Sequence, residues 1–404
     1  MRILMISFDK TILTEGPAKP GDAQERHIKY AQALRQRYSD GHITVILRVP
    51  PSWLSQPVEL AEGLKAYPVP CQRWAFLVKA IPVLKRLAKR ERFHIVTTQS
   101  PFDDGFIGVW LKRSFGIPLN VQMRSSFLDL SYWIQERPIL YRIANKLGKW
   151  VAHQADTIRV VSYGEKERLE NQFPKLKGKV ICLHPLANMQ TFGEPVTDGE
   201  LHQVQEVLKA RALNNTPFLL FVGRFAAQKN LPTLLEAFAL VTKRMPTAIL
   251  VMVGDGPLEN ELKRLVMQLK IGRHVVWLGN LSLRSLRAWY AAARATVLPS
   301  YHEGFGKVIV ESYLIGTPVI ATPFVSAKEL ICNGQMGFVV PDFTNYAWLA
   351  DRMVSLLTHP ELAKEMGRKG KEHIQSYLLP ESEYLERLVD IWRQTAYMAS
   401  QMHR

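Results

Sequence analysis

The stretch that decides the fold is FLLFVGRFAAQKNLPTLLEAFALVTKRMPTAILVMV, residues 218–253. It begins with an apolar run of strand length, continues with a helical pattern over 231–244 and ends with a second apolar run over 248–253. Apolar runs of this kind, separated by an amphipathic helix, are typical of parallel strands in a sheet covered by helices. The stretch therefore predicts a strand–helix–strand unit of an α/β protein.

The same alternation extends towards both ends of the chain. In the first half we expect strands near residues 2–8, 43–48, 94–98, 119–123, 157–161 and 179–183, and the clearest helices at 24–37, 103–114 and 137–153. In the second half we expect strands near 217–222, 248–253, 274–278, 295–298 and 317–320, and helices at 231–244, 257–269, 282–293, 306–315 and 344–357. The pattern predicts two doubly wound, Rossmann-like α/β domains in series, with a ligand at the carboxyl ends of their strands.

A segment rich in Pro, Gly and Asn, residues 185–198, interrupts this rhythm and is the expected linker. We place a first domain at residues 1–190 and a second domain at residues 191–380. Residues 381–404 have a helical pattern with no strand after it, and we expect this tail to pack back on the first domain.

The composition is that of a folded soluble protein, because 47% of the 404 residues are apolar and 22% are charged. The cysteines Cys71, Cys182 and Cys332 have no metal-ligand spacing, which fits free thiols in a reducing compartment. The apolar runs are strand-sized, so none is expected to span a bilayer. The expected location is the cytoplasm.

The net charge of +16 is unevenly distributed. Residues 1–195 hold 29 Lys and Arg against 17 Asp and Glu, a net of +12, and the remainder holds 23 against 19, a net of +4. The partner of the first half is therefore expected to be anionic: a phospholipid surface, a phosphorylated acceptor or nucleic acid.

Two cations follow the strand expected at 217–222. Gly223 ends this strand, Arg224 emerges at its carboxyl end, and Lys229 stands at the start of the next helix. Ligands of open α/β sheets bind at this edge, and two cations beside a helix N-terminus suit a diphosphate. For this segment alone, a solvated Arg and Lys at a strand–helix corner is the alternative interpretation.

The next strand runs into a glycine-rich turn, Gly254-Asp-Gly256-Pro257. Glycine lets backbone amides approach a nucleotide closely, but it also makes a tight turn. The tight turn is sufficient to explain this segment when it is taken by itself.

Two carboxylates, Glu303 and Glu311, flank a glycine-rich helix start. Glu303 is expected in the loop after a strand, and Glu311 about one turn into the helix that follows. Carboxylates accept hydrogen bonds from vicinal hydroxyls, and amides at a helix start suit an anion. The unit suits a nucleotide sugar, although a capping carboxylate and a solvated one would give the same pattern.

Taken together, these segments resemble family 4 of the glycosyltransferases, the retaining group 1 enzymes with the two-domain GT-B fold. The resemblance covers about residues 215–345 and depends on the order of Gly223-Arg224, Lys229, Glu303 and Glu311. It implies that Arg224, Lys229 and Glu303 are the catalytic residues, with the two cations on the diphosphate and Glu303 on the transferred sugar. It implies that Glu311 binds the ribose. The resemblance also implies six further substrate-binding residues. Gly223, Gly254 and Leu278 are expected to contact the nucleotide, and Gly304, Phe305 and Gly306 are expected to contact the sugar and the phosphate.

The first half resembles the family more weakly. Many members have a glycine-rich loop after the first strand, and here Gly21 opens a helix, where its backbone is expected to face the diphosphate. An ordinary helix N-terminus is the alternative for Gly21. Many relatives have a histidine after the strand at 119–123, whereas this chain has Arg124. Either Arg124 binds an anionic acceptor or the usual sugar contact is absent.

Two basic amphipathic segments stand out in the first half. The first, residues 74–92, has an expected apolar face of Trp74, Leu77, Val78, Ile81, Leu84 and Leu87. Pro82 is expected to kink or shorten its helix. The second, residues 137–153, repeats Arg142, Lys146 and Lys149. Such helices lie on anionic membrane surfaces, but helices that cover a sheet have the same pattern, and both interpretations stay open.

The predicted function is retaining transfer of a hexose from a nucleotide diphosphate sugar, with a UDP-sugar favoured over GDP-mannose. No cofactor and no metal are expected, because an Asp-x-Asp motif is absent and two cations can neutralise the departing diphosphate. The expected acceptor is anionic or lipid-linked, such as a precursor of a cell-surface polysaccharide. Peripheral contact with the inner face of the membrane stays open, and nucleic acid is not an expected partner.

Two alternatives stay open at this point. The first is a nucleotide-sugar epimerase on the same fold, which would turn over the donor without any acceptor. The second is a basic nucleic-acid-binding protein, whose affinity would fall steeply with salt but which gives no reason for the paired glutamates. The sequence does not identify the sugar, the base, the acceptor or the oligomeric state.

Overall fold

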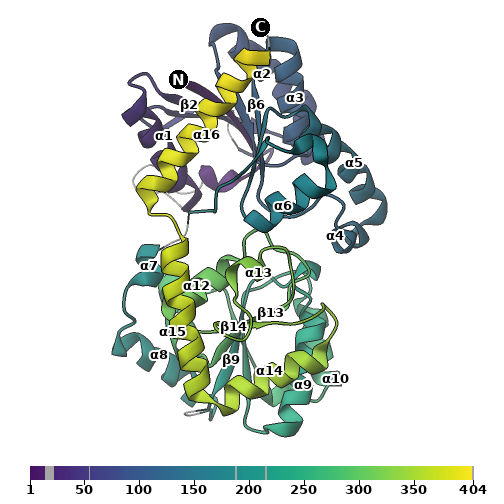
Figure 1. The fold of residues 1–404 in the computed structure, drawn as a ribbon, viewed down its shortest axis with the longest axis vertical. Helices are drawn as coiled ribbons and strands as arrows, with labels where there is room; N and C mark the ends of the chain where they lie inside the picture. The colour runs from purple at the N-terminus through teal and green to yellow at the C-terminus, as the bar shows by residue number, and fades with distance from the viewer. Residues whose placement is uncertain (14–21, 54, 187–188, 214–215, 403–404) are drawn as a thin grey trace. The chain divides into compact units, whose positions relative to one another are not determined.

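The computed structural model describes residues 1–13, 22–53, 55–186, 189–213 and 216–402. The chain forms two compact units (Figure 1). Unit 1 consists of Met1–Leu130, Arg137–His184 and Pro380–Arg404, and unit 2 consists of Ser131–Glu136 and Pro185–Leu379. The second unit thus begins at Pro185 rather than at residue 191, and it also takes up residues 131–136 from the first half.

Unit 1 is built on an eight-stranded sheet with the order β3-β4-β2-β1-β5-β6-β7-β8. Its strands are β1 (Arg2–Ser7), β2 (His42–Val49), β3 (Val58–Ala61), β4 (Leu64–Pro70), β5 (Ile95–Thr98), β6 (Leu119–Met123), β7 (Thr157–Val160) and β8 (Val180–Cys182). All neighbours pair in parallel except β3 and β4, which are antiparallel. The central strand β1 lies between β2 and β5, so the strand order reverses beside it, and ligands of such sheets bind at this reversal.

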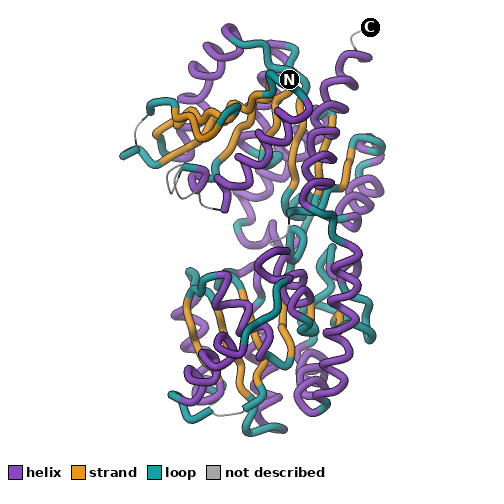
Figure 2. Tube along the Cα trace, turned by 90° about the vertical axis from the view of Figure 1, so that its left-hand side faces the viewer, coloured by secondary structure: helices purple, strands orange, loops and turns teal. Residues whose placement is uncertain are grey.

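Helices cover both faces of this sheet (Figure 2). They are α1 (Asp22–Arg37), α2 (Phe76–Arg90), α3 (Asp103–Phe115), α5 (Pro138–Gln154), α6 (Tyr163–Gln172) and α16 (Glu381–Met402), with 3-10 turns η1 (Lys10–Ile12), η2 (Arg73–Ala75) and η3 (Pro174–Leu176). Residues of α2, α3 and α5 share a buried cluster with Leu4 and Ile6 of β1. On the other face α1 meets α16, where the rings of Tyr30 and Trp392 pack edge to face with centroids 6.1 Å apart.

The helix in the first basic segment differs from the expectation. Pro82 lies inside α2 without ending it, on the exposed side, where water can satisfy the carbonyl group that the missing N–H leaves free. The buried face consists of Phe76, Ala80, Leu84 and Leu87. Trp74 and Val78 are 83% and 73% exposed, so the expected apolar face is wrong for these two residues.

Unit 2 contains a six-stranded parallel sheet with the order β11-β10-β9-β12-β13-β14. Its strands are β9 (Phe218–Val222), β10 (Ile249–Val253), β11 (Val275–Gly279), β12 (Ala295–Leu298), β13 (Val319–Ala321) and β14 (Gly337–Val339). The deciding stretch forms β9, α9 (Leu231–Arg244) and β10, with Phe218 in register with Ile249. The prediction of two α/β domains with parallel sheets is confirmed.

Short and long helices surround the sheet of unit 2. Besides α9 they are α4 (Ser131–Glu136), α7 (Met189–Gly193), α8 (Asp198–Lys209), α10 (Glu259–Gln268), α11 (Leu283–Ala292), α12 (Lys307–Ile315), α13 (Ala327–Leu330), α14 (Tyr346–Thr358) and α15 (Pro360–Tyr377), with 3-10 turns η4 (Ala227–Lys229) and η5 (Gly272–His274). Local signals fix their ends: Thr197 and Glu200 form a capping box at the start of α8, and left-handed Gly306 and Gly316 bound α12. None of the described helices is long and apolar enough to cross a membrane.

Candidate active site

Four neighbouring strands of unit 2 end at one edge of its sheet. They are β11, β10, β9 and β12, and each pairs in parallel with the next. Because parallel strands point the same way, the loops after them leave the sheet at the same edge, where ligands of α/β sheets bind. The structure thus brings together the segments that the sequence predicts for the donor site: residues 223–230, 254–257, 277–279 and 299–311.

The glycines of the 254–257 turn are required by the neighbouring loop. Gly254 has a φ of +128°, and a Cβ atom there would lie 2.1 Å from the carbonyl oxygen of Gly223. At Gly256, with a φ of +157°, a Cβ atom would lie 2.4 Å from the carbonyl oxygen of Phe225. Close packing between the loops after β9 and β10 therefore accounts for both glycines without a nucleotide.

Lys229 and Glu303 meet at this edge. Lys229 ends η4, and its side chain runs past Gly223, where a Cβ atom would lie 3.3 Å from Lys229 Cε. Lys229 Nζ donates to Glu303 Oε1 at 2.5 Å, and Ser300 Oγ donates to the same oxygen at 2.6 Å. The two charged side chains are only 14% and 12% exposed, so they form a largely buried ion pair.

Arg224 lies directly after Gly223 and is exposed. The backbone around it is fixed, because Gly223 N donates to Val253 O at 3.0 Å and Phe225 N donates to Asp255 O at 2.6 Å. Among the described residues its guanidinium has no hydrogen-bond or ion-pair partner. A rigid backbone thus holds a cation at the edge of the sheet, where it can reach a ligand.

Glu311 lies on α12, one turn beyond Lys307. Tyr290 Oη donates to Glu311 Oε2 at 2.9 Å, which leaves Oε1 able to accept from a ligand hydroxyl. Burial raises the pKa of the Glu311 carboxyl, while the Tyr290 hydrogen bond and the charges of Lys307 and Lys229 act in the opposite direction. The carboxylate is therefore desolvated, and a hydroxyl donor would restore part of its lost hydration.

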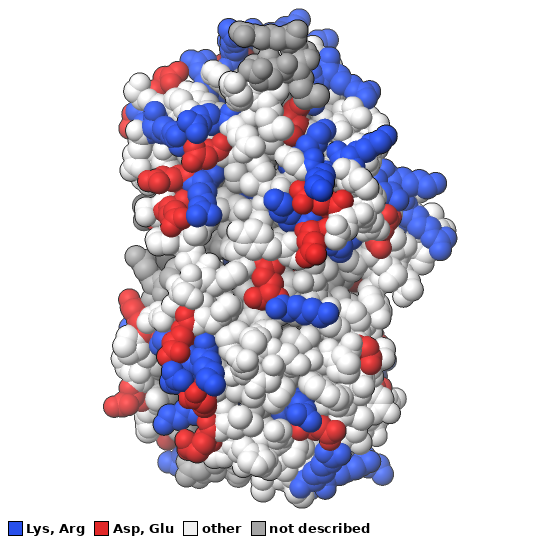
Figure 3. Space-filling model, in the orientation of Figure 1, with Lys and Arg blue, Asp and Glu red and all other residues white. Residues whose placement is uncertain are grey.

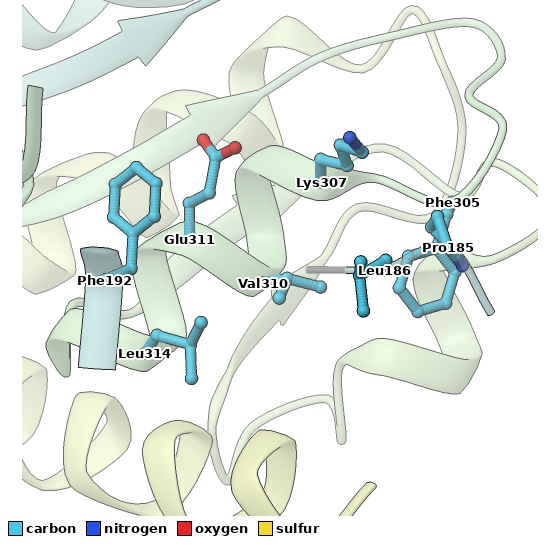
Figure 4. A pocket seen from close by; sticks show the side chains of 8 residues that line it. All are labelled: Pro185, Leu186, Phe192, Phe305, Lys307, Val310, Glu311 and Leu314. Carbon is cyan, nitrogen blue, oxygen red and sulfur yellow. The ribbon is translucent and has the colours of Figure 1, made fainter. Parts of the chain in front are cut away.

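A small cavity of about 20 Å³ lies beside Glu311 (Figure 4). Lys307 and Glu311 rise from one side of α12, and the ring of Phe192 from α7 lies next to Glu311. The rest of the lining is apolar: Pro185, Leu186, Phe305, Val310 and Leu314. The cavity is therefore lined by apolar side chains, with one carboxylate and one amine beside them.

The loop after β12 is held by side chains that reasoning from the sequence missed. The backbone oxygen of Gln228 accepts from Tyr301 N at 2.9 Å, and Gln228 Nε2 donates to His302 O at 2.7 Å. Tyr132 of α4 stacks on Tyr301 with ring centroids 4.5 Å apart, and Glu136 Oε1 lies 3.6 Å from His302 Nε2. Gln228 lies inside the predicted motif and could have been included. Tyr132 and Tyr290 carry no local signal.

The remaining predicted residues lie as follows. Leu278 is half-buried on β11, beside the bond from Gly254 N to Gly279 O at 2.8 Å. Gly304 follows Glu303 and precedes the cap of α12. Arg124 is in unit 1, directly after β6, and Gly21 lies outside the described residues. The ligand contacts expected of these residues stay predictions.

Two family models match this chain. The model of the glycosyl transferases group 1 matches residues 205–373, and that of the glycosyl transferase 4-like domain matches residues 28–184. The chain belongs to the group 1 glycosyltransferases of family 4. It is a glycosyltransferase that acts on nucleotide sugars. This membership replaces the two alternatives, the epimerase and the nucleic-acid-binding protein.

This glycosyltransferase is similar to several named enzymes. It is 29% identical over 263 residues to the α-D-kanosaminyltransferase of Streptomyces kanamyceticus, covering 64% of this chain and 66% of that protein. It is 25% identical over 407 residues to the D-inositol 3-phosphate glycosyltransferase of Kribbella flavida, covering 93% and 92%. With the alpha-monoglucosyldiacylglycerol synthase of Streptococcus pneumoniae it shares 28% over 253 residues, covering 62% and 56%. The match thus spans about two thirds of the first relative and little more than half of the third.

Solved structures show the fold of the glycosyltransferase. Sucrose-phosphate synthase from Thermosynechococcus elongatus superposes with a TM-score of 0.79 at 22% identity, covering 98% of both chains. Anabaena HepE, solved with UDP and glucose, has a TM-score of 0.69 at 17% identity, covering 96% of this chain and 98% of that one. The two units are those of the GT-B architecture.

Proposed function

We propose that this glycosyltransferase transfers a hexose with retention of configuration from a nucleotide diphosphate sugar, with a UDP-sugar favoured over GDP-mannose. We also propose that it needs no metal ion and no other cofactor. The observation that carries the proposal is the largely buried Lys229–Glu303 pair, at the sheet edge that also holds Glu311. One edge thus offers a cation for the diphosphate and carboxylates for the hydroxyls of the sugar and the ribose.

In the proposed donor complex each part of the nucleotide sugar has its own partner. Glu311 accepts hydrogen bonds from the ribose hydroxyls. Arg224 and Lys229 contact the diphosphate, and the N–H groups at the start of α12 support the sugar and the phosphate. Because a diphosphate competes with Glu303 for Lys229, donor binding releases Glu303 towards the hydroxyls of the transferred sugar.

The proposed reaction breaks the bond between C1 of the sugar and the diphosphate. Negative charge grows on the leaving phosphate, and Lys229 and Arg224 stabilise this charge by an amount on the order of several kcal/mol. The leaving phosphate accepts the proton of the attacking hydroxyl on the same face of the sugar, and the new bond forms on that face. Retention then follows without a covalent intermediate on the protein.

We propose that the acceptor is anionic or lipid-linked, such as a precursor of a cell-surface polysaccharide. The net charge of +12 in residues 1–195 supports an anionic partner. The names of similar proteins agree with this class: a D-inositol 3-phosphate glycosyltransferase, an alpha-monoglucosyldiacylglycerol synthase and WaaG, a glycosyltransferase involved in lipopolysaccharide biosynthesis.

Exposed apolar side chains on two helical segments of unit 1 support peripheral contact with an anionic membrane. On α5, Ile139 and Ile143 are exposed, and the exposed cations Arg142 and Lys146 lie on the same helix. Figure 3 shows Lys and Arg side chains projecting from the edge of unit 1 where Figure 1 labels α5. Exposed Trp74 lies in η2, and exposed Val78 lies in the first turn of the basic helix α2. Lys149, in contrast, is paired with Asp129 at 2.9 Å. We therefore do not propose Lys149 as one of the cations that contact the membrane.

A thermal-shift screen with UDP-, GDP- and ADP-sugars in EDTA tests the proposed donor. A ligand at 100 times its Kd stabilises the folded protein by about 2.7 kcal/mol, which such a screen resolves. We expect the UDP-sugars to raise the Tm most. If none of the three classes of nucleotide sugar stabilises the protein, the proposed donor is wrong. If stabilisation requires Mg²⁺ or Mn²⁺, the proposal that no metal ion is needed is wrong.

A further inference from the structure

The sheet face of unit 1 that α1 and α16 cover is polar along β5, β6 and β7. Asn120 Nδ2 donates to Thr157 Oγ1 at 2.8 Å, and Thr157 Oγ1 lies 2.6 Å from Thr395 Oγ1 of α16. Further along, Arg159 Nη1 donates to Gln122 Oε1 at 3.3 Å. A buried network of neutral groups therefore surrounds the guanidinium of Arg159.

Arg159 has no carboxylate partner among the described residues. It is 6% exposed, its Nη2 donates to Tyr384 Oη at 2.8 Å, and its Nε has no hydrogen-bond partner in the part of the chain that the structure describes. The hydroxyl of Tyr384 in turn lies 3.0 Å from that of Tyr30 on α1. Burying a guanidinium without an anion costs desolvation energy, so this face of the sheet has an uncompensated positive charge.

Two buried side chains at the start of α1 have unused hydrogen-bonding groups. Gln24 and His27 lie one turn apart on the same side of the helix and are 0% and 1% exposed. Among the described residues, both amide atoms of Gln24 and the Nε2 atom of His27 have no hydrogen-bond partner. His27 Nδ1 donates to Ala23 O at 2.6 Å, so Nε2 carries the lone pair and can only accept. Native proteins rarely leave such groups unsatisfied, which points to a ligand.

Arg124 adds a cation at the same edge. It follows β6 directly, is exposed, and has no ion pair or hydrogen bond with the described side chains. Burial lowers the pKa of His27 to about 4, and the nearby charges of Arg26 and Arg124 act in the same direction. Arg124 therefore lies within electrostatic reach of the start of α1, beside the point where the strand order reverses at β1.

We propose that Gln24, His27 and Arg124 bind a phosphate-bearing, hydroxylated acceptor. Arg124 contacts the phosphate, with Arg159 adding positive charge, because guanidinium groups match phosphate oxygens in geometry and charge. The lone pair of His27 Nε2 requires a hydroxyl donor, and the amide of Gln24 can donate and accept. A phosphorylated sugar or polyol satisfies all of these groups, whereas a neutral sugar leaves the cations without a partner. This inference rests on the proposed function, because it assigns the acceptor of that reaction.

A binding experiment on the full chain separates this acceptor from the diphosphate of the donor. The protein is first saturated with UDP and then titrated by calorimetry with glycerol 3-phosphate, with glycerol, and with sodium chloride at equal ionic strength. We expect glycerol 3-phosphate to bind and the two controls not to bind. Arg124→Gln is expected to lower the affinity for glycerol 3-phosphate at least about tenfold and to leave the affinity for UDP unchanged. Lys177→Gln, which removes an exposed cation elsewhere in unit 1, should change neither.

Two further variants keep the result interpretable. Arg124→Lys, which keeps the charge but not the planar guanidinium, should bind glycerol 3-phosphate with intermediate affinity. Gln24→Glu, which adds a negative charge, should weaken the binding of glycerol 3-phosphate as Arg124→Gln does. The inference is overturned if UDP binds but glycerol 3-phosphate does not. It is also overturned if Arg124→Gln no longer binds UDP, because Arg124 would then belong to the donor-binding site. If no nucleotide binds the parent protein, the proposed function itself fails, which is a different result.

Discussion

Replacing Glu311 by Gln tests the ribose contact with little structural change. Glutamine keeps the shape of the side chain and an oxygen that can accept the Tyr290 hydrogen bond, but it removes the charge. Hydrogen bonds to charged groups contribute about 1.5–3 kcal/mol, so the variant should bind nucleotide about 10-fold to 150-fold more weakly. Because burial raises the pKa of Glu311, the folded state disfavours its charged form, and the Tm without nucleotide should not fall.

Calorimetry with the nucleotide that gives the largest thermal shift measures this loss. Glu261→Gln, an exposed carboxylate on α10, is the matched control and should bind like the parent. Since its pKa is raised, Glu311 takes up a proton at a higher pH than an ordinary glutamate. Parent affinity should therefore fall as the pH drops through that raised pKa, and Glu311→Gln should show no such fall. Equal affinities, or equal pH profiles in parent and variant, would refute the assignment of Glu311 to the ribose.

Four other variants test the leaving group, the turn and the membrane contact. Arg224→Gln and Lys229→Gln should each lower kcat more than they raise KM, because charge on the diphosphate grows in the transition state; steady-state kinetics in EDTA that show only a KM effect would contradict this. Gly254→Ala should lower the free energy of unfolding by about 1–3 kcal/mol, because its Cβ would meet Gly223 O at 2.1 Å, whereas Gly199→Ala, with nothing within 4 Å, should not lower the Tm. Changing Lys85, Arg86, Lys89 and Arg90 together to Gln should abolish sedimentation with anionic vesicles at low salt, since each near-surface cation contributes about 1 kcal/mol to membrane binding. If the parent protein does not sediment with such vesicles, the proposed membrane contact is wrong.

Elements with a strong local pattern could be predicted from the sequence. The apolar run and the helical pattern after it located β9 and α9 within a residue of their observed bounds. The hairpin of β3 and β4 was not expected, because β4 contains Pro68 and Pro70, which remove ladder donors and usually indicate a loop. Its antiparallel turn uses Gly63 at a φ of +78°, a signal too short to detect by periodicity.

The edge of the donor site was also predictable, because the carboxyl ends of parallel strands meet at one edge whatever the details of packing. The partners within it were not. That Lys229 pairs with Glu303 depends on how η4 meets the loop after β12. That Tyr290 supports Glu311 depends on which sides of α11 and α12 face each other. Likewise, nothing in residues 131–136 indicates that Tyr132 stacks on Tyr301 of the second unit.

The anomeric configuration of the first-formed product tests the central claim most directly. The donor found by thermal shift, an α-linked nucleotide sugar, is incubated with the protein and an acceptor in EDTA, and the anomeric proton of the new product is followed by NMR. The proposed mechanism predicts that the α-anomer appears first, at a rate that EDTA does not change. A β-anomer that appears first, or no reaction until a divalent cation is added, would contradict retaining, metal-independent transfer.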